Sequence, residues 1–341
     1  MKQLLKSCEG SNGVETIFHL SDIHIRLFQR HTEYQYIFEK CYQYIRKYKK
    51  GNHIIVVTGD IVHNKNDLSP ECDTITIDFL QSLASLYPTL IIAGNHDALL
   101  NNRHRMDSIT SMLYQRTIPN LYYMKQTGIY EYENILFFVD SLLDDDKLKL
   151  DDSENTKIKI GLYHGQVSGW KNNYGFTTET GDKTLQDFDG LDYVLLGDIH
   201  KHQFMKTQNP VVAYAGSMIS QNFGESDEDH GVLLWNLIKK TQKLHRFENP
   251  YRHQDISLFA KQNYYITDDK KYDLGDVSPI AKKGQIRVVG ADTVESKLIL
   301  NRWREQVPKT TFHFNQNKKI KNENDINLFI LEGVKQNDMH H

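Results

Sequence analysis

Five short polar clusters, each placed directly after an apolar run, most constrain the fold of this 341-residue chain. In chain order they are Ser21-Asp22-Ile23-His24, Gly59-Asp60, Gly94-Asn95-His96-Asp97, His164-Gly165 and Gly197-Asp198-Ile199-His200-Lys201-His202. Each apolar run has the length of a buried strand, and unbroken apolar strands are typical of parallel sheets covered on both faces. Because the carboxyl ends of such strands open onto one crevice, we expect the five clusters to converge.

The segments between the first three clusters carry helix signals. Residues 33–50 repeat apolar side chains at spacings of three and four, and Gly51 ends this predicted helix. Ser69 and Pro70 are suited to the N-cap and first position of a second helix, which runs to about Leu86. With strands predicted over 16–20, 53–58 and 89–93, the alternation indicates an α/β domain.

Short strands dominate the chain after about Pro119, and we expect them to form a second sheet or to extend the first. They cover residues 129–132, 136–139, 158–163, 193–196, 211–214 and 232–235. Beyond Pro250, strands over 264–267, 285–289 and 311–314 and a helix over about 293–305 predict a small α+β domain. The expected organisation is a main domain over 1–250, a small domain over 251–318, and a polar linker or the start of a partner-docking segment over 319–341.

The charge and cysteine content limits the cellular setting. The chain has 41 Lys and Arg against 44 Asp and Glu, a net charge of −3, which argues against a general nucleic-acid coat but not against a DNA enzyme with an acidic active site. Cys8, Cys41 and Cys72 cannot form a disulfide framework, so a reducing compartment fits best. With no membrane span and no signal-peptide core, we expect an intracellular protein that is not secreted, in the cytoplasm, nucleus or a viral factory.

The residue types in the clusters fit one kind of chemistry. Two divalent cations about 3.5–4 Å apart need oxygen and imidazole ligands, with one carboxylate shared between them. Mixed carboxylate, amide and imidazole ligands suit manganese, iron or zinc better than calcium. Asp-x-His and His-x-His spacings would direct alternate side chains to one side of an extended segment. The candidate ligands are Asp22, His24, Asp60, Asn95, His164, His200 and His202.

The ordered motifs resemble the signature of the calcineurin-like metallophosphoesterases. Within that superfamily the chain is most similar to the SbcD-type nucleases, which include the meiotic-recombination nuclease of double-strand-break repair. The segments that carry the likeness are Gly59–Lys65 with its extra His63, Gly197–His202, and Tyr214–Ser217 followed by Phe223–Glu225. Asp198 stands where the family has its first histidine. The resemblance covers about residues 16–235.

The resemblance implies a four-layer α-β-β-α sandwich with a small α+β capping domain. It assigns one metal to Asp22, His24, Asp60 and His202 and the other to Asp60, Asn95, His164 and His200, with Asp60 as the bridge. His96 is the candidate general acid for the leaving oxygen. Asp97 either orients a neighbouring imidazole or stabilises a turn. His63 positions the phosphate backbone, supports His96, or is a surface loop histidine.

The implied activity is that of a two-metal-dependent DNA phosphodiesterase, with 3′-to-5′ exonuclease and endonuclease activity. Manganese is the expected metal, with magnesium, iron and zinc as alternatives. The resemblance also implies a homodimer and an SMC-like ATPase partner, as in an SbcC–SbcD-type complex. Two other functions stay open: a phosphatase or phosphodiesterase for small phosphoesters, and a non-catalytic DNA-binding scaffold subunit.

Basic residues beside the clusters are candidate DNA contacts. Arg26 and Arg30 follow the first cluster, Arg103 and Arg105 follow the third, and Lys201 lies in the fifth. Each could neutralise a backbone phosphate, which would make DNA binding more sensitive to salt. Short basic runs of this kind are also common in solvated loops.

Overall fold

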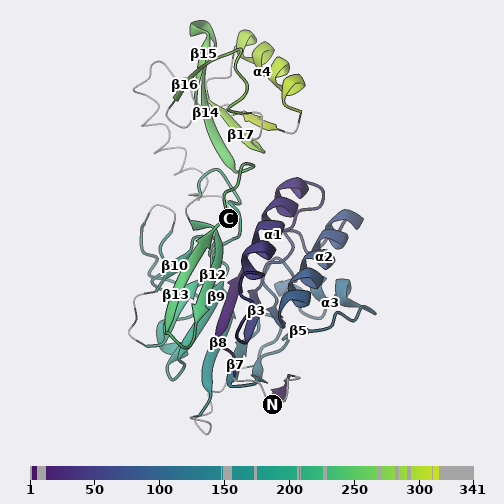
Figure 1. Cartoon of the computed structure of the whole chain (residues 1–341), viewed down its shortest axis with the longest axis vertical. Helices are drawn as coiled ribbons and strands as arrows, with labels where there is room; N and C mark the ends of the chain where they lie inside the picture. The colour runs from purple at the N-terminus through teal and green to yellow at the C-terminus, as the bar shows by residue number, and fades with distance from the viewer. Residues whose placement is uncertain are drawn as a thin grey trace. The chain divides into compact units, whose positions relative to one another are not determined.

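A computed structural model of the chain divides it into two units (Figure 1). The first comprises Met1–Ile219 with Glu228–Phe247, and the second comprises Ser220–Asp227 with Glu248–His341. The structure describes residues 2–5, 13–146, 148, 156–172, 175–205, 207, 209–225, 229–267, 270–280, 284–289, 293–308 and 310–314. The predicted segment 319–341 lies outside these residues.

A six-stranded sheet carries the first three clusters. Its strands β2 (Thr16–Leu20), β3 (His53–Thr58), β4 (Thr89–Ile92) and, at one edge, β5 (Leu121–Tyr123) are parallel. On the other side of β2, strands β12 (Gly231–Asn236) and β13 (Thr241–Arg246) add antiparallel pairings. The run predicted over 232–235 therefore extends the first sheet.

A seven-stranded sheet carries the last two clusters. Its order is β1-β6-β7-β8-β9-β11-β10. Strands β7 (Ile135–Asp140), β8 (Ile158–His164), β9 (Tyr193–Gly197) and β11 (Val211–Tyr214) are parallel to one another. The flanking strands are β1 (Lys2–Leu4), β6 (Gly128–Tyr132) and β10 (Gln203–Phe204).

The two sheets pack face to face, and alternate residues of each strand fill the space between them. Ile54 and Val56 of β3 contribute to the core shared with Phe137 and Leu195 of the other sheet. The intervening residues Ile55 and Val57 pack under the helices on the opposite face. This burial on both faces explains why the strands read as unbroken apolar runs.

Helices cover the outer face of the six-stranded sheet (Figure 1). They are α1 (His31–Ile45), α2 (Pro70–Leu86) and the short α3 (Ser108–Leu113). The predicted cap of α2 is confirmed, since the Ser69 hydroxyl accepts the backbone N–H of Cys72 at 3.2 Å. No helix among the described residues is both long and apolar enough to cross a bilayer.

The outer face of the seven-stranded sheet is covered differently. Val167, Phe188 and Leu191 close a core with Phe138 and Val194 of the sheet. They come from the segment after β8, whose regular part is the 3₁₀ turn η2 (Leu185–Phe188). The metallophosphoesterase sandwich is therefore confirmed, with a fourth layer that consists here of loop and 3₁₀ turn.

The second unit has its own core. Its sheet has the order β16-β15-β14-β17-β18, and Leu300 and Trp303 of α4 (Val294–Gln306) pack with Ile256, Tyr265 and Ile286 of the sheet. The strands are β14 (His253–Phe259), β15 (Tyr264–Thr267), β16 (Lys270–Asp273), β17 (Gln285–Val289) and β18 (Thr311–Phe314), and η4 (Ala260–Gln262) joins the first two.

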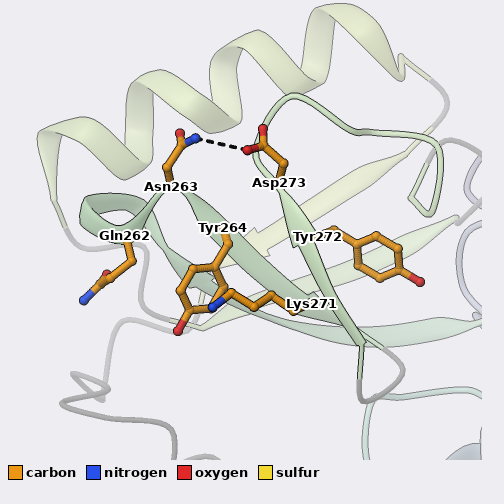
Figure 2. A pocket seen from close by; sticks show the side chains of 6 residues that line it. All are labelled: Gln262, Asn263, Tyr264, Lys271, Tyr272 and Asp273. Carbon is orange, nitrogen blue, oxygen red and sulfur yellow. Dashed lines mark hydrogen bonds between the residues drawn. The ribbon is translucent and has the colours of Figure 1, made fainter.

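A shallow pocket of about 600 Å³ lies on the β15–β16 hairpin of this unit (Figure 2). The Lys271 ammonium lies 3.6 Å from the centre of the Tyr264 ring, a cation–π contact, and Asn263 donates to Asp273. The side chains that line the pocket are therefore largely engaged with one another.

The core between the two sheets predicts a large effect of Phe137→Ala. Phe137 is fully buried, so its removal should leave a cavity and lower the free energy of unfolding by about 3–5 kcal/mol in urea denaturation. Phe204→Ala, at a side chain that is 46% exposed, is the control and should change it by less than about 0.5 kcal/mol. Equal losses would show that the inter-sheet packing is not what stabilises this unit.

Candidate metal centre

The five clusters converge at the carboxyl ends of parallel strands from both sheets. Asp22, Asp60 and Asn95 come shortly after β2, β3 and β4, whereas His164 is the last residue of β8 and Asp198 follows β9. Thr58 connects the two sheets at this point, because its carbonyl accepts a hydrogen bond from His164 Nδ1 at 2.7 Å. The predicted convergence of the clusters is seen directly in these contacts.

The backbone at the site is held in an unusual conformation. Asp22, His24 and Asp60 have φ of 51°, 51° and 54°, in the left-handed region that costs a non-glycine residue about 1–3 kcal/mol. Hydrogen bonds from Asp22 N to the Gly59 carbonyl (3.1 Å) and from His24 N to the Asp60 carbonyl (2.9 Å) fix this geometry. The side chains of Asp22 and His24 thus converge although both residues have a left-handed backbone conformation. The prediction that Asp-x-His forms an extended segment was wrong.

Asp22, His24 and His200 form a first group of converging donor atoms, all within 4.8 Å of one another. His24 Nε2 lies 3.0 Å from His200 Nε2 and 3.5 Å from Asp60 Oδ2. Two imidazole nitrogens at this separation, next to buried carboxylates, fit a shared cation. The residues present therefore match the divalent metal that the sequence predicts.

Asp22, Asp60 and His164 form a second group, whose donor atoms also lie within 4.8 Å of one another. His164 Nε2 lies 2.9 Å from Asn95 Oδ1 and 3.4 Å from Asp60 Oδ1. Because His164 Nδ1 donates to a backbone carbonyl, Nε2 is the nitrogen directed at these oxygens. An imidazole oriented in this way is typical of a metal ligand.

The Asp60 carboxylate lies between the two groups. Its Oδ2 faces His24, while its Oδ1 faces His164 and also accepts the backbone N–H of His96 at 2.8 Å. The side chain is almost completely buried. One carboxylate with an oxygen directed at each group is the arrangement that a bridging ligand requires.

Burial and charge shift the pKa values of the site in opposite directions. Burial raises the pKa of Asp22 to about 6, and it also raises that of Asp198. Burial opposes the charge of Asp60, but the neighbouring imidazoles of His164 and His24 outweigh it and hold its pKa below the usual range. Burial lowers the pKa of His24 well below its ordinary value.

His164 behaves in the opposite way to His24. Burial lowers its pKa, but the carboxylates of Asp60 and Asp22 outweigh burial and raise it well above the ordinary value. The surrounding carboxylates therefore favour a positive charge at this position. A divalent cation would supply such a charge.

His63 and His96 lie at the edge of the first group. His96 Nδ1 donates to the His63 carbonyl at 2.7 Å, which leaves its Nε2 as the remaining ring nitrogen. His63 Nε2 accepts from the Arg26 guanidinium at 3.0 Å, and its Nδ1 lies 3.4 Å from His24 Nδ1. Burial, followed by the charge of Arg26, lowers the pKa of His63 to about 4. His63 therefore forms a cluster of histidines with His24 and His96.

Asp97 joins two of the loops. Its carboxylate accepts the backbone N–H groups of Ile61 (3.0 Å), Val62 (3.1 Å) and Gly94 (2.9 Å), and it is fully buried. Burial, with the charge of Asp60, raises its pKa to about 7. Of the two roles considered for Asp97, these contacts support the stabilisation of a turn.

The fifth cluster requires a correction. The resemblance assigned His202 to the metal of Asp22 and His24, but the structure places His200 there, and His202 lies outside the donor groups found among the described residues. His202 Nδ1 instead faces the Tyr214 carbonyl at 2.9 Å. The reason is a bend at Lys201, between the two histidines, so that the alternation of an extended strand does not apply.

Asp198 itself was not among the predicted ligands. Its Oδ1 lies 3.9 Å from His164 Nε2, beside the second group. Its place in a Gly-Asp pair directly after a strand, like that of Asp60, was the signal in the sequence that could have identified it.

The candidate DNA contacts have different environments. Arg30 is bonded through two nitrogens to Glu33 and its side chain is 3% exposed, so it stabilises the start of α1 and does not face solvent. Arg103 pairs with Asp145, Lys201 donates to the Asn172 carbonyl at 3.4 Å, and Arg105 is exposed. Arg26 is the one that contacts a histidine of the site.

Comparison with known proteins identifies relatives of this chain. The family described as calcineurin-like phosphoesterase matches residues 15–202, which include all the candidate ligands. Protein R555 of Acanthamoeba polyphaga mimivirus, described as uncharacterized, is 38% identical over 265 residues, which are 74% of this chain and 20% of the viral protein. The chain thus spans about a fifth of that relative's length.

Two further relatives carry the name phosphoesterase. One is 244L of Invertebrate iridescent virus 6, which is 29% identical over 206 residues, 58% of this chain and 68% of the relative. The other is 078R of Invertebrate iridescent virus 3, which is 22% identical over 311 residues, 87% of this chain and 79% of the relative.

The contacts of Asp97 predict a destabilising effect of Asp97→Ala. Leaving three buried N–H groups without their acceptor should lower the free energy of unfolding by at least about 2 kcal/mol in urea denaturation. Asp145→Ala, at a carboxylate that is 93% exposed, should change it by less than about 0.5 kcal/mol. If the two variants were equally stable, the Asp97 carboxylate would not be what joins these loops.

Proposed function

The chain belongs to the calcineurin-like phosphoesterase family, and from this premise we propose that it is a two-metal DNA phosphodiesterase, the nuclease subunit of a double-strand-break repair complex. The observation that carries the proposal is the Asp60 carboxylate, which directs one oxygen to each of two donor groups. A shared carboxylate between two oxygen- and imidazole-rich groups is the arrangement that phosphoester hydrolysis by paired cations needs.

One cation would be held by Asp22, His24, Asp60 and His200, and the other by Asp60, Asn95 and His164. The mixed donors suit Mn²⁺, with Mg²⁺, Fe²⁺ and Zn²⁺ as alternatives. When bound, such cations lower the pKa of an attacking water and neutralise charge on the phosphoryl oxygens.

The protein's own groups would orient the phosphodiester and supply a proton. His96 donates through Nδ1 to the His63 carbonyl, so its Nε2 is the atom that would protonate the leaving oxygen. The guanidinium of Arg26 fixes the ring of His63 beside His24, where it would contact the phosphate. Asp97 keeps the loops of Asp60 and Asn95 in register.

DNA is the proposed substrate because of segments outside the metal ligands. The resemblance to SbcD-type nucleases rests on Gly59–Lys65, Gly197–His202, Tyr214–Ser217 and Phe223–Glu225. A separate unit with its own core follows the phosphoesterase unit in the sequence, at the place of the capping domain of those nucleases. We therefore propose 3′-to-5′ exonuclease and endonuclease activity.

We also propose a homodimer and an SMC-like ATPase as its partner. Helix α2 buries Phe79, Leu80 and Leu83, but Ile75 and Leu86 are only partly covered within the chain. We expect light scattering at micromolar concentration to give twice the 39.8 kDa of one chain. A single-chain mass would contradict the dimer.

Removing the shared carboxylate is the sharpest test of the two-metal site. Asp60→Asn should lose most cleavage of linear duplex DNA and bind both cations more weakly, because one carboxylate neutralises charge at both positions. The measurements are nuclease activity with Mn²⁺, its loss in chelator, and metal content per chain. Two cations bound at wild-type affinity in the variant would disprove the bridge.

The same assay separates the alternative functions. Cleavage of nitrophenyl phosphoesters without cleavage of DNA would favour an enzyme for small phosphoesters. DNA binding with no bound metal would favour the non-catalytic scaffold.

His96→Asn should affect the reaction and leave binding unchanged. A general acid is typically worth about 10²–10⁴ in rate, so turnover on DNA should fall by that factor while metal content and DNA affinity stay the same. A nitrophenyl phosphodiester, whose leaving group needs less proton donation, should be partly rescued. His104→Asn, at an exposed histidine, is the control. Equal losses on both substrates, or loss of one cation, would contradict the assignment.

A further inference from the structure

Asp198 lies beside the second donor group, and the two-metal assignment above gives it no role. Its side chain is 20% exposed, and its Oδ1 lies 3.9 Å from His164 Nε2. Its backbone N–H donates to both oxygens of Asp22, at 3.2 and 3.3 Å. With φ of 95°, the residue adopts a backbone conformation that side-chain-bearing residues rarely take. The fold thus holds this carboxylate at the site.

The second group has one nitrogen surrounded by oxygens. His164 Nε2 faces Asn95 Oδ1 at 2.9 Å, Asp60 Oδ1 at 3.4 Å and Asp198 Oδ1 at 3.9 Å. The first group instead combines the imidazoles of His24 and His200 with the carboxylates of Asp22 and Asp60. The two halves of the site therefore differ in composition: the second group has one imidazole among oxygen donors, whereas the first has two imidazoles.

This difference has a chemical consequence. Carboxylate and carbonyl oxygens suit Mg²⁺ and Mn²⁺, whereas imidazole suits Zn²⁺ and other metals later in the first transition row. A third carboxylate beside Asp22 and Asp60 also adds negative charge, which a bound cation would compensate. A histidine at this position, as in the resembled nucleases, would supply neither effect.

We propose that Asp198 is the fourth ligand of the second group and that it biases this half of the site toward Mn²⁺ or Mg²⁺ and against Zn²⁺. The inference rests on the proposed two-metal function and goes beyond it, because it assigns a metal preference to one half of the site. The first group contains no side-chain ligand from Asp198 and serves as an internal reference.

The test is metal binding by the full chain after its metals have been stripped. Calorimetric titrations with Mn²⁺ alone and with Zn²⁺ alone would be compared for wild type, Asp198→Asn and Asp198→His. Asp189→Asn, at an exposed aspartate, is the matched control, and melting temperatures of the stripped proteins report folding.

We expect Asp198→Asn to bind one Mn²⁺ as wild type does and the second at least about tenfold more weakly, the range seen when groups around a metal are removed. Asp198→His should regain two-metal binding, with the ratio of Zn²⁺ to Mn²⁺ affinity at the second position raised by at least about tenfold. Asp189→Asn should bind both metals as wild type does.

Two results would overturn the inference. Wild-type affinity for both Mn²⁺ ions in Asp198→Asn would show that the carboxylate is not a ligand. An unchanged Zn²⁺ to Mn²⁺ ratio in Asp198→His would show that it does not select the metal. Failure of the underlying function is distinguishable, because the wild type would then bind no pair of cations and Asp60→Asn would have no effect on metal binding.

Discussion

The Asp60 carboxylate, buried where the two sheets meet, is the interaction on which the organisation of the site depends. Its Oδ2 faces His24 of the first cluster and its Oδ1 faces His164 of the other sheet. A carboxylate buried without compensation would be strongly unfavourable, so the imidazoles around it are a physical necessity as well as candidate ligands. Each sheet supplies part of this compensation, and neither sheet could form the site alone.

The rest of the first unit keeps these strained loops in place. Asp22, His24 and Asp60 adopt left-handed conformations, which persist only where surrounding structure determines them. The Asp97 carboxylate joins the loop after β3 to the loop after β4, and the Thr58 carbonyl fixes the ring of His164. Below them, the packed core between the sheets prevents the strand ends from moving apart.

The histidines at the site differ in their electrostatic environment and in what orients their rings, although His24 and His164 are both proposed as metal ligands. His164 is surrounded by carboxylates, which raise its pKa, whereas burial lowers the pKa of His24. His96 is oriented by a backbone carbonyl, and His63 by the guanidinium of Arg26. Neutral imidazoles suit metal binding, and a ring with one nitrogen fixed by the backbone suits proton transfer through the other.

The sequence by itself determined the strands that carry the five clusters, helices α1, α2 and α4, and the convergence of the clusters, because the periodicity of apolar residues records which face of each element is buried. It also identified Asp60 and His164 at strand ends and Ser69 as the cap of α2. It did not indicate strands β5, β13, β14 and β16. Only the tertiary structure decided that His200, and not His202, joins His24, and that Asp198 lies beside His164. The direction of a ligand side chain depends on a backbone turn that is fixed by hydrogen bonds to distant segments, and spacing along the chain does not encode those partners.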